Sequence, residues 1–257
     1  MLARLRERGR TRRARAAEPM TLVAHLAELR YRVIVAMVAV AAGGVLGFLL
    51  YEPVLELLQE PYCEIREDCS FLVTKPVDSF SLRLRISAYI GLLVASPVVF
   101  WQLWRFVTPG LYEREKKYAV PFVASSIVLF VVGGLLALWT IPRALEFFVD
   151  VGGGADLVDA KYALKEYLSL VTFMMLAFGI GFEFPVILVF LEVAGVLHWR
   201  QLAGWWRYAI LLIFVIDAVI TPSQDPISLL ALGIPMCVLY AVAILIGRVV
   251  QRNRPAP

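Results

Sequence analysis

Histidine and cysteine are scarce in this chain of 257 residues, which contains two histidines and three cysteines. Zinc sites group several such ligands, and histidine-dependent catalysis needs a histidine beside a nucleophile or a second base. His25 and His198 each stand alone, and no glycine-rich phosphate loop, nucleophile elbow or metal-ligand cluster is found in the sequence. These absences argue against an enzyme, and we expect neither a metal nor another cofactor.

Charge is also scarce, because 18% of the residues are charged while 60% are hydrophobic. Soluble globular domains are usually ~45–50% apolar. The apolar excess lies in long runs, and a helix needs ~20 apolar residues to cross a bilayer. The sequence therefore predicts an all-α membrane protein whose residues 20–248 form six transmembrane helices. The six runs are Val33–Leu50, Ile86–Trp104, Tyr118–Ile141, Tyr167–Leu191, Tyr208–Ile220 and Ile227–Gly247.

The fifth run is short, and two prolines follow within the segment from Thr221 to Pro226, so the last two runs are predicted to form a tight hairpin. Nine of the 25 Lys and Arg residues precede Val33. The positive-inside rule therefore places both termini in the cytoplasm. We expect residues 1–19 to be a disordered basic tail that touches anionic lipid, and residues 249–257 to be a cytoplasmic tail. No aromatic or folded module accompanies the basic tail, so nucleic acid is not an expected partner.

Glu183 is the carboxylate that a membrane environment makes most costly, because it lies in an otherwise uncharged apolar stretch. It is either a structural carboxyl hydrogen-bonded inside the bundle or a docking point for a partner. Asp217 precedes Thr221 by about one turn and is expected near the headgroup zone. Asp225 is positioned to cap the last helix.

Two acidic segments are predicted on the cytoplasmic side, one before the first span and one after the second. Leucines at helical spacing predict an amphipathic helix before the first span, and this helix carries Glu28. Residues 111–118 are predicted to form a short charged helix that carries Glu115. The ordinary interpretation is a local salt bridge for Glu28 and a solvated loop for Glu115. If the two carboxylates converge, they form a site for an arginine-bearing peptide, because a guanidinium binds carboxylates bidentately.

The first two cysteines, Cys63 and Cys69, both fall in the first outer loop, with five residues between them. An oxidising compartment permits a disulfide between them, and two free thiols are the alternative. Cys237 lies in the last helix and is predicted to be a packing residue.

Four separated motifs follow one another in the sequence from about His25 to Arg248. They are His25-Leu-Ala-Glu28-Leu-Arg30; Trp101-Gln-Leu-Trp-Arg-Phe-Val-Thr-Pro109-Gly-Leu111 with Glu115-Lys-Lys; Phe178-Gly-Ile-Gly-Phe182-Glu183-Phe-Pro185; and Thr221-Pro222 with Asp225 and Ile234-Pro235. In this order they resemble the TatC family, the multi-spanning receptor subunit of the twin-arginine protein translocase. The resemblance implies a cupped bundle of six spans with short fifth and sixth helices. Ala241 and Leu229 depart from the pattern, since many members carry Glu and Gln there.

The resemblance also implies a role in the bacterial inner membrane. A protein of this family receives the twin-arginine signal peptides of folded cargo. It assembles into an oligomeric complex with TatA/TatB-type single-span subunits, and the proton gradient drives export. The residues expected to bind the signal peptide are Glu28, Arg30, Leu111 and Glu115. Those expected to bind partner helices are Phe182, Glu183, Pro185, Thr221 and Asp225. Those expected to be structural are Cys63 and Cys69 in the first outer loop, Pro61 and Phe80 in the periplasmic cap, and Pro109 in the turn after the second span.

A different hypothesis is a proton-coupled transporter of small solutes that uses Glu183 and Asp217 as a relay. It predicts that the cytoplasmic carboxylates tolerate substitution. An intramembrane hydrolase is disfavoured, because the spans lack a Ser/His, His/Glu/His or paired-Asp arrangement.

Overall fold

The computed structural model describes residues 22–63, 71, 75–107, 119–151, 163–221 and 225–252. This part of the chain is built of helices and contains no strand. Five of its helical segments are long and apolar enough to cross a membrane. These segments are His25–Leu49, Pro76–Val107, Ala119–Phe148, Leu164–Val193 and Pro226–Val250.

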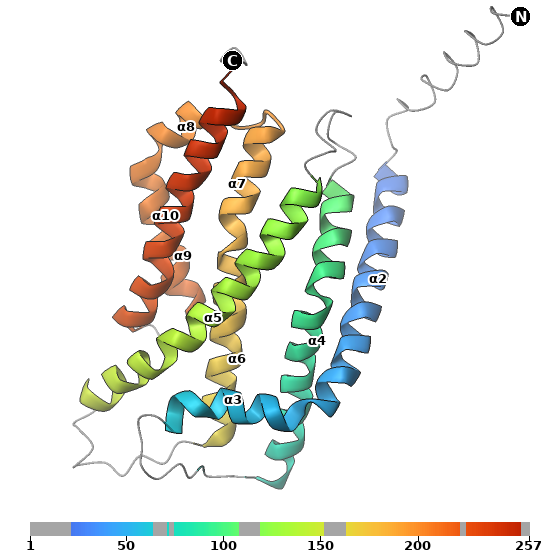
Figure 1. The fold of residues 1–257 in the computed structure, drawn as a ribbon, viewed down its shortest axis with the longest axis vertical. Helices are drawn as coiled ribbons and strands as arrows, with labels where there is room; N and C mark the ends of the chain where they lie inside the picture. The colour runs from blue at the N-terminus through green and yellow to red at the C-terminus, as the bar shows by residue number, and fades with distance from the viewer. Residues whose placement is uncertain are drawn as a thin grey trace, which may run out of the picture.

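The long helices are arranged as a bundle (Figure 1). They are α2 (Leu22–Leu49), α4 (Pro76–Val107), α5 (Ala119–Val151), α6 (Leu164–Gly181) with its continuation α7 (Glu183–Val193), and α10 (Pro226–Val250). The shorter helices are α3 (Tyr51–Cys63), α8 (Trp199–Gly204) and α9 (Trp206–Ile220). Figure 1 shows the start of α2, the end of α4, α8 and the end of α10 at one end of the bundle, which we call the α8 end. Helix α3 lies across the opposite end, which we call the α3 end.

Helices α2 and α4 pack closely because glycines face each other across their interface. A Cβ atom added to Gly43 would lie 2.7 Å from the Gly91 carbonyl oxygen, and one added to Gly47 would lie 2.6 Å from the Ser87 carbonyl oxygen. Small residues let two helix backbones approach in a membrane, where the hydrophobic effect does not drive helix association. The amphipathic segment predicted around Glu28 is helical and continues without interruption into the rest of α2.

Helix α9 confirms the prediction of a short fifth helix, because it has 15 residues. At 1.5 Å per residue it is about 22 Å long, less than the ~30 Å hydrocarbon thickness. The prediction that the sixth helix is also short is wrong, because α10 has 25 residues. Asp225 caps α10 as predicted, since its side chain accepts a hydrogen bond of 2.7 Å from the Ser228 amide. The apolar sequence then continues through Pro235 to the end of the helix, which explains its length.

Aromatic contacts hold α3 against the end of the bundle. The Tyr167 hydroxyl of α6 donates a hydrogen bond of 2.9 Å to the Leu58 carbonyl of α3. The Tyr62 ring lies 4.5 Å from that of Phe71 and 5.5 Å from that of Tyr167, measured between centroids. Helix α3 therefore covers the end of the transmembrane region as a packed element.

The predicted structural residues fall at or near this covered end. Pro61 belongs to α3, whereas Phe80 lies near the start of α4 with 60% of its surface exposed. Cys63, the last residue of α3, is part of a disulfide, and Cys237 is a free, half-buried thiol. Cys69 and Pro109 lie outside the described residues.

Candidate functional site

Glu28 lies where the beginning of α2 meets the end of α4. Its Oε1 atom accepts a hydrogen bond of 3.1 Å from Arg32 Nε, and the two side chains form an ion pair one helical turn apart. Arg32 also reaches Gln102 of α4, with 3.5 Å between Nη1 and Oε1. The salt bridge considered for Glu28 is therefore confirmed. The other carboxylate oxygen, Oε2, is buried and has no hydrogen-bond partner among the described residues.

A ring contact joins the same two helices. The His25 ring stacks on the Phe106 ring, with 4.4 Å between centroids and 19° between planes. Residue 25 lies almost one turn before Glu28, and residue 106 lies in the last turn of α4. The contact places Glu28 beside the point from which the chain continues into residues 108–118.

The other residues expected to bind a signal peptide are only partly described. Arg30 is exposed on α2. Leu111 and Glu115 lie outside the described residues, and so does the short charged helix predicted around them. The predicted approach of Glu28 and Glu115 therefore stays a prediction.

Glu183 is the first residue of α7, directly after the break that separates this helix from α6. Phe182 occupies the break and is buried, and its amide still donates a hydrogen bond of 3.0 Å to the Phe178 carbonyl. Pro185 is buried in the first turn of α7, where its missing amide hydrogen removes no helical hydrogen bond. The sequence Gly-Phe-Glu-Phe-Pro thus turns one long apolar run into two helices.

The Glu183 carboxylate is half-buried and incompletely paired. Its Oε1 atom is buried without a hydrogen-bond partner among the described residues. The Ser126 hydroxyl of α5 lies next to this carboxylate and accepts a hydrogen bond of 3.1 Å from Trp104 Nε1 of α4. Three helices therefore contribute a short chain of polar groups to an otherwise apolar region.

Aromatic rings surround this chain of polar groups. Trp104 is buried, stacks on Phe122 with 4.8 Å between centroids, and meets the edge of Phe190 at 5.0 Å. Tryptophans near the end of a transmembrane helix usually lie in an aromatic belt at the membrane surface. Trp101 is 43% exposed, but Trp104 packs inward because α5 and α7 cover it.

The acidic residues near the hairpin between α9 and α10 are buried. Asp217 is 1% exposed, and its backbone carbonyl accepts a hydrogen bond from the Thr221 hydroxyl. Its expected depth near the headgroup zone stays a prediction. Asp225 and Thr221 are equally enclosed. No hydrogen bond or ion pair of the described residues joins Glu183 to this group, and none links Glu183 with Asp217 as a relay would require.

A further buried carboxylate, Glu192, escaped the sequence interpretation. It directly follows the apolar run that ends at Leu191, so the sequence alone indicates a position outside that span. The structure instead places it near the end of α7, fully buried against Gly247 of α10, with neither carboxylate oxygen hydrogen-bonded among the described residues. The apolar residues that follow it, 193–197, were the one sequence signal for burial.

Comparisons with known proteins, by sequence and by fold, match the same family. The model of the family described as "Sec-independent protein translocase protein (TatC)" matches residues 24–235. The chain belongs to the TatC family. The TatC protein of Frankia casuarinae is 38% identical, over 96% of this chain and 72% of that protein. The TatC protein of Aquifex aeolicus is 36% identical, over 91% of this chain and 98% of that protein.

Two solved structures of the twin-arginine translocase receptor TatC have the same fold. One superposes with a TM-score of 0.75 at 35% identity and covers 89% of this chain and all of that chain. The other, in DDM, gives 0.74 at 36% identity, over 87% of this chain and 99% of that chain. As a member of the TatC family, this chain is a membrane-embedded component of a Sec-independent protein translocase, and its role is protein transport. This assignment replaces the solute-transporter hypothesis.

Proposed function

We propose that this chain is the receptor subunit that binds twin-arginine signal peptides of folded proteins, with Glu28 and Glu115 as the residues that meet the arginine pair. One observation carries the proposal: Glu28 keeps one buried carboxylate oxygen without a partner at the junction of α2 and α4. An unsatisfied buried acceptor gains a strong hydrogen bond when a guanidinium arrives.

Arg32 sets the selectivity of this receptor. It already neutralises Glu28 through Oε1, so an incoming arginine engages the vacant Oε2 side and needs a second carboxylate of its own. Glu115 follows the end of α4 by eight residues, which is within reach of the junction formed by His25 and Phe106. Two carboxylates beside one resident arginine favour a ligand with two adjacent guanidinium groups. Arg30 and Leu111 flank these carboxylates in the sequence and contact the peptide beside the pair.

Glu183 serves as the docking point for single-span partner subunits of the TatA/TatB type. A half-buried carboxylate with a vacant oxygen in a bilayer gains free energy when a partner helix brings a polar group. Phe182 and Pro185 shape the break that presents it, and Thr221 and Asp225 belong to a second contact near the α9–α10 hairpin.

The membrane arrangement that accompanies this function has six spans, with α9 as the short fifth one. The α8 end faces the cytoplasm of a bacterial inner membrane, because Arg30, Arg105, Arg200, Arg207 and Arg248 all belong to elements at this end. Residues 20–248 form the membrane domain, and residues 1–19 and 249–257 are cytoplasmic tails. Transport by the oligomeric complex draws on the proton gradient.

The test is the binding of a signal peptide that carries Arg-Arg, compared with the same peptide carrying Lys-Lys, to the purified chain in detergent. We expect Arg-Arg binding to fall at least ten-fold in Glu115→Gln, because a charge-assisted hydrogen bond contributes ~1.5–3 kcal/mol. Glu52→Gln, an exposed carboxylate on α3, is the matched control and keeps full binding. Equal binding of both peptides, or unchanged binding in Glu115→Gln, contradicts the proposal.

A further inference from the structure

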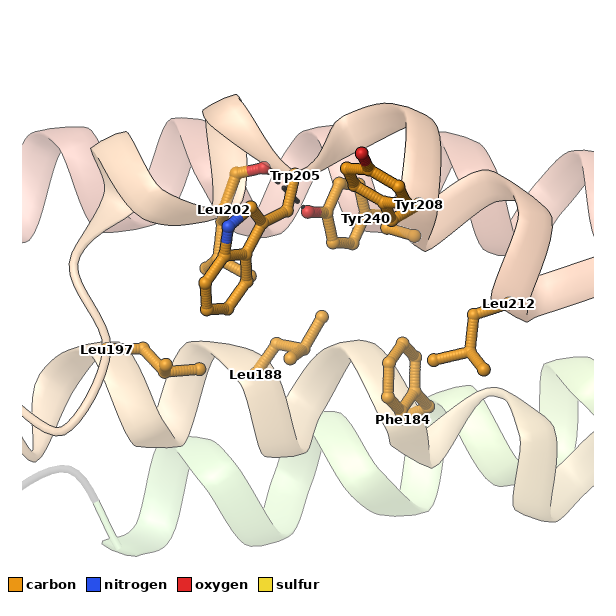
Figure 2. A pocket seen from close by; sticks show the side chains of 9 residues that line it. Phe184, Leu188, Leu197, Leu202, Trp205, Tyr208, Leu212 and Tyr240 are labelled. Carbon is orange, nitrogen blue, oxygen red and sulfur yellow. Dashed lines mark hydrogen bonds between the residues drawn. The ribbon is translucent and has the colours of Figure 1, made fainter.

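An apolar cavity lies at the α8 end, between α7 on one side and α8 with α9 on the other (Figure 2). Its volume is ≈ 390 Å³. Side chains that point into it are Phe184, Leu188, Leu202, Trp205, Tyr208 and Tyr240. The Tyr240 hydroxyl is already occupied, because it donates a hydrogen bond of 2.7 Å to the Leu202 carbonyl. The cavity therefore suits a ligand part that makes no hydrogen bonds.

Three arginines that lie over tryptophan rings belong to elements at the same end of the bundle as the cavity. The Arg207 guanidinium lies 5.4 Å from the Trp206 ring, and those of Arg200 and Arg248 lie 5.4 Å and 5.5 Å from the Trp199 ring. All three arginines are exposed, and no carboxylate of the described residues forms an ion pair with them. Cations held by tryptophan at the end of a transmembrane bundle lie at the depth of lipid headgroups.

We propose that this cavity is a binding site for an anionic phospholipid. One acyl chain fills the cavity, and the phosphate group contacts Arg207, which lies in sequence between the cavity-lining residues Trp205 and Tyr208. Arg200 and Arg248 add positive potential to the same end of the bundle and so favour a negatively charged headgroup. The bound lipid would fill the space between α7 and α9, two helices that would otherwise leave apolar surface uncovered there.

The size of the cavity favours an acyl chain over a partner helix. A volume of ≈ 390 Å³ lies in the range of small-molecule sites, ~300–1,000 Å³. A transmembrane helix is ~30 Å long and ~10 Å wide, so at most one of its side chains would enter. The proposal concerns lipid alone and does not depend on signal-peptide binding.

Native mass spectrometry of the full chain released from detergent tests the proposal. We expect the unmodified chain to retain one phosphatidylglycerol molecule. Ala209 lines the cavity, so Ala209→Trp fills it and lowers retention at least ten-fold. Ala218→Trp, on the same helix but outside the cavity, is the matched control and keeps the lipid. Should Ala209→Trp fail to fold, as judged by circular dichroism and elution volume, Leu212→Trp fills the same cavity from an exposed position.

A second measurement examines the headgroup. Titration with phosphatidylglycerol and phosphatidylcholine is expected to show a preference for phosphatidylglycerol that falls about five-fold in Arg207→Gln, while the acyl chain is still accepted. Equal lipid retention in the filled and unmodified cavities overturns the proposal. So does a filled cavity that keeps the lipid but loses co-purification of a single-span partner, because the cavity would then receive a side chain of that partner.

Discussion

The His25 ring lies on the Phe106 ring at 4.4 Å between centroids, and this contact joins the first turn of α2 to the last turn of α4. The two residues are far apart in sequence, yet their contact holds the turn before Glu28 against the end of α4. The proposed peptide site therefore depends on a contact that makes no direct use of either carboxylate.

Replacing Phe106 tests this dependence. We expect Phe106→Ala to weaken Arg-Arg peptide binding about two- to ten-fold, because an aromatic pair contributes ~0.5–1.5 kcal/mol beyond its buried area. Phe106→Tyr retains the ring and serves as the control with near-normal binding. Fluorescence titration with a labelled signal peptide measures both. If Phe106→Ala binds as well as the unmodified chain, the stack does not position the site.

Glu28 itself is expected to contribute more to peptide affinity than Phe106 does. Glu28→Gln keeps the shape of the side chain but removes the charge that holds Arg32 and the vacant Oε2 acceptor. Peptide affinity should fall at least ten-fold. Arg32→Gln is the informative companion, because it leaves the carboxylate unneutralised and should relax the preference for Arg-Arg over Lys-Lys. A selectivity that stays the same in Arg32→Gln would show that the resident arginine plays no part.

Local features of this fold were predictable from the sequence because each depends on a few adjacent residues. The Asp225 cap, the short α9 and the helix carrying Glu28 are of this kind, and so is the ion pair with Arg32, which lies four residues along the same helix. The inward packing of Trp104 and the burial of Asp217 were not predictable in the same way. Both depend on which other helices cover the position, and this information is spread over distant parts of the chain.

If Glu183 is the docking point for a single-span partner, removing its carboxylate should abolish contact with that partner. A photoreactive residue in the transmembrane helix of a single-span partner subunit should crosslink to the unmodified chain, and Glu183→Leu should abolish this crosslink by removing the vacant acceptor. Glu183→Gln keeps one acceptor oxygen and should retain part of the crosslink. Glu166→Gln, an exposed carboxylate on α6, is the control with full crosslinking. An intact crosslink in Glu183→Leu would assign Glu183 a purely structural role.

The Glu192 carboxylate packs against α10 at position 247, where glycine has no side chain. A Cβ atom on Gly247 would fall on the Glu192 carboxylate, so the fully buried Glu192 side chain would have to shift to make room. Gln251, also buried, fixes the surrounding backbone by donating 2.7 Å and 2.8 Å hydrogen bonds to the carbonyls of Glu192 and Leu197. These two hydrogen bonds tie the end of α10 to the end of α7 and to Leu197, which opposes an outward shift of α10.

Gly247→Ala is expected to destabilise the chain by about 1–3 kcal/mol, the usual cost of overpacking a tight interface. Thermal unfolding in detergent, followed by circular dichroism, measures the change. Gly204→Ala adds the same methyl group where no atom lies within 4 Å, so it should not lower the melting temperature. The double variant Glu192→Ala with Gly247→Ala removes the obstructing carboxylate and should recover most of the loss, whereas Glu192→Gln with Gly247→Ala keeps the obstruction and should not. Recovery by the glutamine variant would mean that the charge of Glu192, and not its volume, makes the glycine necessary.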